Sequence, residues 1–310
     1  MSNSEFEWYY FDIHTQNGYD IVFTLHTKPF NTVFPVALFD LFIYKNNKSY
    51  AHKFFSKPVH MLRKNYDNYA VYYDQNNFIR NDGERIIVSA QDENMVLKIE
   101  LNDPSLNRRG KEIELMPGGG NDTHFKWILY TPMCRAKAEF CCDDQQHFFE
   151  GRGYHDYNAG NFRMKDMLRQ WYWGKFYLGD TTLIYGAIIG KNGEKRSICI
   201  QSDGREYHQD DQPEKSVGGG RIVIRCNQKE FVFTVDKSFM LENYPFYMFN
   251  LSAHFKWVGK IIEMIIYFIS KKTVLKKFTF LLANVRYHRY RKYLKYNNAP
   301  VDLFFEEIRF

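Results

Sequence analysis

The sequence lacks the residue patterns on which most metal and cofactor sites depend. Its ten histidines are scattered, and no His-x-x-x-His or His-x-His pair lies beside a carboxylate at metal-ligand spacing. The glycine triplets at 118–120 and 218–220 have neither the spacing nor the following Lys-Ser/Thr of a phosphate loop. No Gly-x-Ser-x-Gly elbow of a serine hydrolase occurs. We therefore expect no metal, nucleotide or organic cofactor.

The sequence also lacks the signs of an exported, disulfide-bonded protein. Its five cysteines are an odd number and include no Cys-x-x-Cys pair. Residues 1–5 contain no basic region followed by an apolar core, so we expect no secretory signal. A cytoplasmic location with reduced thiols is expected.

The net charge of +6 is unevenly distributed along the chain. Residues 257–296 contain ten basic side chains and one acidic side chain, so the remainder is net acidic. The run from Arg286 to Lys295, interleaved with tyrosines, has the character of a phosphate-tracking element. Because the rest of the chain is acidic, we do not expect nucleic acid as a partner.

Aromatic residues make up 18% of the chain, and this high content predicts β-structure because aromatic residues favour strands. Strand-like runs of alternating or apolar residues are separated by turn signals at roughly ten-residue spacing, as in sandwiches and barrels. These runs lie at 19–25, 70–73, 85–90, 95–101, 126–130, 181–185, 197–201, 221–225, 231–235 and 301–310. We expect an all-β protein.

A weak internal repeat supports two domains of similar size. Each copy reads aromatic strand, tight turn and apolar strand, with the aromatic strands at Glu7–Phe11 and Gln170–Gly174. The alternative is a coincidence of two aromatic clusters in a chain this rich in aromatics. We predict one barrel domain over residues 1–160 and a second over residues 161–310.

The segment 257–296 differs from the rest of the chain in its pattern of apolar and basic residues. Seven apolar residues crowd positions 261–269 without a Gly or Pro break, which predicts one or two helices. Lys260 and Glu263 interrupt this run, which is too short for a transmembrane span. One reading is an amphipathic helical pair that rests on an anionic membrane, and this would make the protein membrane-associated. The other is a helix packed against a barrel with a solvated basic face.

The most specific pattern is Gly151-Arg152-Gly153-Tyr154-His155-Asp156-Tyr157-Asn158-Ala159-Gly160, followed by Trp171-Tyr172-Trp173-Gly174 and Gly179-Asp180-Thr181-Thr182. It resembles the signature of carotenoid 1,2-hydratases and AttH-like lipocalin-type proteins: Gly-x-Gly-Tyr-His-Asp-His-Asn-Trp-Gly, then Trp-x-Trp-Gly, then Gly-Asp-x-Thr. Glu7–Asp12 and Trp127–Arg135 resemble two further elements of that family. The resemblance touches both halves of the chain.

The resemblance implies two lipocalin-like antiparallel barrels, with the helical segment near the C-terminus as an insertion. It also implies no cofactor and a pocket for a long hydrophobic ligand. Relatives protonate or cyclise double bonds, and include hydratases and fungal proteins that assist Diels–Alder ring closure. This chain departs from the hydratase pattern at Tyr157 and Ala159, where the hydratases have a His and a Trp held to be catalytic. Gly186 and Ala187 follow Tyr185 where a carboxylate is expected.

Hydration or cyclisation of an alkene needs a positioned acid in a cavity that excludes stray water. Asp156 is the acid candidate, because burial among aromatic rings raises the pKa of a carboxyl group. The predicted catalytic residues are Asp156, His155, Tyr157 and Tyr185, and the predicted substrate-binding residues are Tyr154, Asn158, Trp171, Trp173, Trp8 and Tyr10.

Each of these residues could instead have a purely structural role. In a strand, residues 154, 156 and 158 share one face while 155 and 157 share the other, so Asp156 and His155 need not face the same cavity. Either residue can instead brace the fold. Trp171 and Trp173 share a face and form either a pocket wall or a barrel core.

The predicted function is a cofactor-independent hydratase, isomerase or cyclase, a lyase- or isomerase-type enzyme acting on a hydrophobic polyene or terpenoid-like small molecule. The alternative is a non-catalytic lipocalin-like protein that binds a lipid or pigment. The departures at Tyr157 and Ala159 favour this second interpretation.

Overall fold

The computed structural model of the chain is built almost wholly of antiparallel strands. It describes residues 5–28, 36–65, 69–93, 95–102, 111–114, 123–142, 145–203, 207–245 and 286–309. Helix in these ranges is limited to a 3₁₀ turn, η1 (Val59–Met61), and one short α-helix, α1 (Met164–Met167). Within the described ranges, neither helix has the length or the apolar character needed to span a bilayer.

The first sheet has twelve strands in the order β4-β3-β2-β1-β12-β11-β9-β8-β7-β6-β5, with β10 paired to β11. The strands are β1 (Phe6–Thr15), β2 (Tyr19–Lys28), β3 (Val36–Lys45), β4 (Lys48–Pro58), β5 (Arg63–Asn65), β6 (Ala70–Asp74), β7 (Asn77–Asn81), β8 (Arg85–Asp92), β9 (Met95–Asn102), β10 (Lys111–Glu114), β11 (Phe125–Cys142) and β12 (Gln145–Gly160).

The second sheet has nine strands in the order β16-β15-β14-β13-β21-β20-β19-β18-β17. They are β13 (Leu168–Leu178), β14 (Thr181–Gly190), β15 (Lys195–Ser202), β16 (Tyr207–Asp210), β17 (Glu214–Gly218), β18 (Arg221–Cys226), β19 (Lys229–Pro245), β20 (Arg286–Tyr296) and β21 (Ala299–Arg309). All ten strand runs predicted above lie in these two sheets over their described residues, which exclude Phe310.

The two sheets share one strand order. In each sheet the first strand, β1 or β13, pairs with the next strand along the chain and with the last strand of its own sheet, β12 or β21. The two aromatic strands of the sequence repeat therefore occupy equivalent places. The first sheet ends at Gly160 and the second begins at Leu168. A division into two domains at residue 160 remains a proposal.

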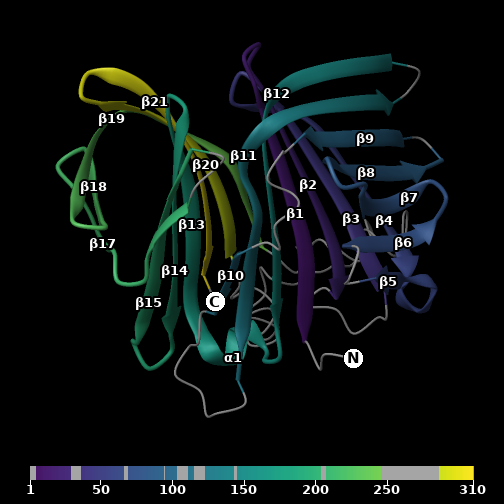
Figure 1. The fold of residues 1–310 in the computed structure, drawn as a ribbon, viewed down its shortest axis with the longest axis horizontal. Coiled ribbons are helices and arrows are strands. Elements are labelled where there is room, and N and C mark those ends of the chain that lie inside the picture. The colour runs from purple at the N-terminus through teal and green to yellow at the C-terminus, as the bar shows by residue number, and fades with distance from the viewer. Residues whose placement is uncertain are drawn as a thin grey trace, which may run out of the picture.

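Both sheets curl into lipocalin-like half-barrels that lie side by side, with β1, β11 and β12 next to β13, β20 and β21 (Figure 1). Buried side chains form three clusters. One fills the concave side of the first sheet, one fills the concave side of the second, and one lies between the sheets. Because β12 has a packed layer on each side, all its residues from Gly153 to Gly160 are buried. We call the layer between the sheets the interface.

The prediction of a helical segment at 257–296 is wrong over its last residues, which form β20. Residues 257–285 lie outside the described residues. Arg289 and Arg291 are only 3% and 6% exposed, because alternation in β20 turns them into the interface. There they pair with Glu306 and Asp20. These two arginines therefore do not contribute to an exposed basic face.

Candidate functional site

Close packing of neighbouring strands explains why the central motif begins with glycines at positions 151 and 153. A Cβ atom on Gly151 would lie 2.1 Å from the backbone oxygen of His14. One on Gly153 would lie 2.7 Å from the Cβ of Ala136. Both contacts are too short for any larger residue, so glycine lets β12 pack closely between β1 and β11. This close packing holds the following residues of β12 at the centre of the molecule.

Asp156 lies in the interface and is fully buried. Its Oδ2 accepts hydrogen bonds from Trp127 Nε1 at 2.8 Å, Tyr154 OH at 2.6 Å and Trp173 Nε1 at 3.3 Å. Asn158 Nδ2 donates to Oδ1 at 2.9 Å. Since Trp173 belongs to the second sheet and the other donors to the first, the carboxyl group links the two sheets.

The environment of Asp156 favours its protonated form. Burial raises the pKa of the carboxyl group to about 7, and the negative charge of Glu306 acts in the same direction. Hydrogen bonds from Tyr154, Trp127 and Trp173 stabilise the carboxylate and oppose the rise. A carboxyl group with a pKa near the working pH can both donate and recover a proton, as a general acid must.

Ion pairs besides Arg291–Asp20 are buried in the interface. Lys175 and Asp12, each fully buried, form a pair that joins β13 to β1. Arg289 Nε donates to Glu306 Oε1 at 2.8 Å, and the Tyr10 hydroxyl donates to the same oxygen at 3.0 Å. Pairing removes most of the cost of burying these charges.

The predicted substrate-binding residues come together around Asp156. All are buried in the interface: Tyr154, Asn158, Trp171, Trp173, Trp8 and Tyr10. The Trp173 ring centroid lies 5.3 Å from that of Tyr154 and 5.4 Å from that of Tyr10, and both pairs are edge-on. Trp8 and Trp171 make a similar contact at 6.4 Å. Tyr154 and Trp173 contact the acid directly, and the aromatic rings of this layer offer faces that can stabilise positive charge.

His155 points to the opposite face of β12, into the concave side of the first sheet. Its Nδ1 donates to the backbone carbonyl of Tyr10 at 2.7 Å, so its Nε2 is the acceptor for the Tyr69 hydroxyl. The imidazole stacks on Phe11 at 3.9 Å and on Tyr130 at 5.2 Å. Burial lowers the pKa of His155 to about 3, which keeps the ring neutral.

Tyr157 lies on the same face as His155. Its hydroxyl donates to Glu7 Oε1 at 2.9 Å, and Glu7 also pairs with Lys64. Because successive side chains of a strand alternate, neither residue meets Asp156. A proton relay from His155 to Asp156 has no support in this geometry.

Tyr185 lies in the concave side of the second sheet, beside Tyr172, with ring centroids 6.0 Å apart. Burial raises the pKa of its hydroxyl. The structure thus divides the four predicted catalytic residues among three packed layers: Asp156 in the interface, His155 and Tyr157 in the first sheet, and Tyr185 in the second.

Several residues of the interface were not anticipated from the sequence. Lys175 directly follows the Trp-x-Trp-Gly element, and Trp127 opens the Trp127–Arg135 element, so both stood in recognisable motifs. Asp12 ends the Glu7–Asp12 element and Arg289 lies in the basic run from Arg286 to Lys295, whereas Glu306 had no such signal. Among the described residues, no cluster of three or more His, Cys, Asp or Glu side chains has the arrangement of a metal site.

Two curated relatives are similar to short parts of the chain. A hydroxyneurosporene dehydrogenase from Chlorobaculum tepidum is 29% identical over 98 residues, 29% of this chain and 26% of that protein. The quinolone epoxide rearrangement protein asqO from Emericella nidulans is 28% identical over 64 residues, 21% of this chain and 18% of that protein. The matched regions span about a quarter and about a fifth of these relatives' own lengths.

Solved structures share the fold over almost the whole chain. A putative AttH from Nitrosomonas europaea has a TM-score of 0.56 at 11% identity, covering 98% of this chain and 92% of that one. CghA with bound Sch210972 has a TM-score of 0.61 at 7% identity, with 100% and 89% coverage. Kievitone hydratase from Nectria haematococca has a TM-score of 0.51 at 9% identity, with 99% and 89% coverage. At these identities the likeness shows the fold.

A family model described as carotenoid hydratase CrtC matches residues 92–260, more than half of the chain. The match includes β12 with Asp156 and the Trp171 and Trp173 strand. Together with the shared lipocalin-like fold, this match shows that the chain belongs to the carotenoid hydratase family.

Proposed function

We propose that the protein is a cofactor-independent hydratase or cyclase that acts on a hydrophobic, unsaturated substrate, with Asp156 as the proton donor. The observation that carries this proposal is a fully buried carboxyl group whose pKa is raised to about 7 inside a shell of aromatic rings. Membership of a hydratase family supports the reaction class.

The chemistry follows from the residues of the interface. Asp156 transfers its proton to one carbon of a double bond, and the adjacent carbon becomes positive. The ring faces of Trp173 and Tyr154 stabilise that charge, while Asp12 neutralises the nearby Lys175. Addition of water and return of a proton to Asp156 complete a hydration. Attack by a second double bond moves the positive charge to a new carbon, and return of a proton from its neighbouring carbon to the Asp156 carboxylate completes a cyclisation.

Water can approach the interface from one end. A hollow of about 660 Å³ opens there, lined by His14, Tyr177 and Arg291 among other polar side chains. The Lys175 amino group lies 5.5 Å from the Tyr177 ring centroid, so this hollow adjoins the Lys175–Asp12 pair. We propose this hollow as the route by which water reaches the site.

The test is turnover of an acyclic carotenoid by purified protein without added cofactor. Asp156→Asn should lower turnover at least about 100-fold while the fold is kept, because a general acid typically contributes 10²–10⁴-fold. The matched control is Glu7→Gln, a buried carboxyl group that pairs with Lys64 on the concave side of the first sheet. Equal turnover by the folded Asp156→Asn variant and the wild type would contradict the proposal.

A second candidate function is binding without chemistry. It is favoured by the four hydrogen bonds that Asp156 accepts, three at Oδ2 from Trp127, Tyr154 and Trp173 and one at Oδ1 from Asn158, as in a structural carboxylate. Recovery of an unchanged lipid or pigment at one per chain, with no turnover by the wild type, would establish this function instead.

A further inference from the structure

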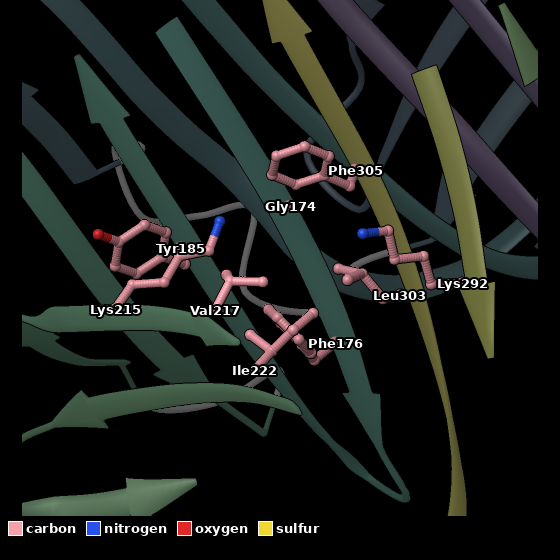
Figure 2. Close-up of a pocket in the computed structure, with 9 residues that line it drawn as sticks. All are labelled: Gly174, Phe176, Tyr185, Lys215, Val217, Ile222, Lys292, Leu303 and Phe305. Atoms are coloured by element: carbon pink, nitrogen blue, oxygen red, sulfur yellow. The ribbon is translucent and has the colours of Figure 1, made fainter. Parts of the chain in front are cut away.

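The concave side of the second sheet contains a cavity of about 100 Å³ (Figure 2). It lies on the opposite face of β13 from Asp156, because Gly174 and Phe176 line the cavity whereas Trp173 and Lys175 face the interface. Its apolar lining is Phe176, Val217, Ile222, Leu303 and Phe305, and its remaining lining residues are Gly174, Tyr185, Lys215 and Lys292.

Two lysine amino groups enter this apolar space from different strands. Figure 2 shows Lys215 of β17 and Lys292 of β20 extending toward the space beside Phe305 from opposite sides. Lys215 Nζ lies 4.4 Å from the ring centroid of Tyr172, 4.7 Å from that of Phe305 and 5.3 Å from that of Tyr185. Within the described residues, neither amino group has an ion-pair partner. Cation–π contacts take the place of a counter-ion.

The electrostatics of the cavity disfavour two unpaired cations. The pKa of Lys215 is lowered to about 8, mainly by burial and also by the charges of Lys292 and Lys195, while Glu307 acts to raise it. Burial also lowers the pKa of Lys292, again against the effect of Glu307. A buried charge without a partner costs free energy, so a bound anion would stabilise both ammonium groups.

We propose that this cavity binds a small amphipathic carboxylate, whose carboxylate group bridges Lys215 and Lys292 and whose apolar chain packs on Ile222 and Leu303. The two cations select a negative head group. The apolar lining selects a short hydrocarbon chain in preference to a polar anion. The site is separate from Asp156 and gives Tyr185, at its wall, a ligand-binding role in place of a catalytic one.

The test is isothermal titration calorimetry of the full-length protein with octanoate, and with 1-octanol as an uncharged ligand of matched length. Octanoate should bind at least tenfold more tightly than octanol. Lys215→Met and Lys292→Met should each weaken octanoate binding at least tenfold, since a hydrogen bond to a charged group is worth at least that factor. Lys191→Met, which alters an exposed lysine in the turn after β14, should leave it unchanged.

Two further measurements separate the site from a general effect on folding. Octanoate affinity should fall as the pH rises through about 8, where Lys215 loses its proton, and this fall should be absent in Lys215→Met. Val217 is 66% exposed at the cavity wall, so Val217→Trp should fold normally, as checked by circular dichroism, and block binding by its bulk. Absence of octanoate binding to the wild type, equal binding of octanol, or unchanged binding by Lys215→Met would overturn the proposal.

Discussion

Replacing Asp156 by asparagine tests the protonation state of the buried carboxyl group without any knowledge of the substrate. Asparagine has nearly the shape of the protonated acid and carries no charge at any pH. Its Oδ1 can occupy the place of Asp156 Oδ2 and accept the hydrogen bonds of Trp127 and Tyr154. Rotation of the Asn158 amide can then offer an oxygen to the new Nδ2. The variant therefore keeps the packing and removes only the charge.

The magnitude follows from the pKa of the carboxyl group in the two states. The pKa is 3.8 in the unfolded chain and about 7 in the folded protein. Between these values the folded state retains a proton that the unfolded state has released, so stability falls as the pH rises and levels off above the folded pKa. One pKa unit corresponds to about 1.4 kcal/mol, so this group lowers the free energy of unfolding by about 4 kcal/mol across the full range.

The assay is urea unfolding of the wild type and of Asp156→Asn at several pH values from 5 to 8, followed by tryptophan fluorescence. Because only the wild type loses stability through this group, Asp156→Asn should gain about 3 kcal/mol relative to the wild type over that range. A stability difference that stays constant with pH would refute a raised pKa and, with it, the role of Asp156 as proton donor.

A second variant tests whether the Tyr154 hydroxyl lowers or raises the pKa of Asp156. Tyr154→Phe removes the hydroxyl that donates to the Asp156 carboxylate at 2.6 Å. The charged form loses a hydrogen bond, so the pKa of Asp156 should rise further and the fall in stability should extend to higher pH. A shift to lower pH would show that the hydroxyl favours the neutral acid instead.

Two remaining predictions concern the packing of the interface, both measured by urea unfolding. Lys175→Met should destabilise the protein by about 3–5 kcal/mol, because it leaves Asp12 buried without the lysine charge that balances it. The double variant with Asp12→Leu should recover part of that loss, and no recovery would show that the pair does not act as a unit. Gly151→Ala should cost at least about 2 kcal/mol through its 2.1 Å contact with the His14 oxygen. Gly218→Ala, where a Cβ meets nothing within 4 Å, should be nearly neutral, and equal losses would contradict the packing argument.

The sequence alone determined the fold class, because strand periodicity and turn signals are local. Its alternating runs all became strands, and the aromatic repeat marked the two equivalent first strands, β1 and β13. The motif from Gly151 to Gly160 was also recognisable from the sequence. Its glycines at 151 and 153 lie where neighbouring strands come too close for a larger residue. Alternation correctly warned that Asp156 and His155 need not face the same cavity.

Local pattern failed where tertiary contacts dominate. The basic run from Arg286 looked like part of an exposed helical segment, yet β20 places Arg289 and Arg291 inside the molecule. A partner makes the burial of a charge less costly: Glu306 lies opposite Arg289 on the adjacent strand β21, and Asp20 of the first sheet pairs with Arg291. Asp20 is 271 residues from Arg291, and the expected helix over 257–296 did not predict the hairpin that sets Glu306 opposite Arg289.

The assembly of the candidate site was likewise decided only by the tertiary structure. The sequence identified Asp156 and the aromatic residues that now surround it, but it did not show that Trp127 and Trp173, from different sheets, donate to one carboxyl oxygen. It placed Tyr185 in the same site, whereas the curl of the second sheet puts that residue beside Lys215 in a different cavity. The reason is physical: strand periodicity assigns each residue to a face of its strand, but only the packing of the two sheets decides which faces meet and which carboxyl group loses its water.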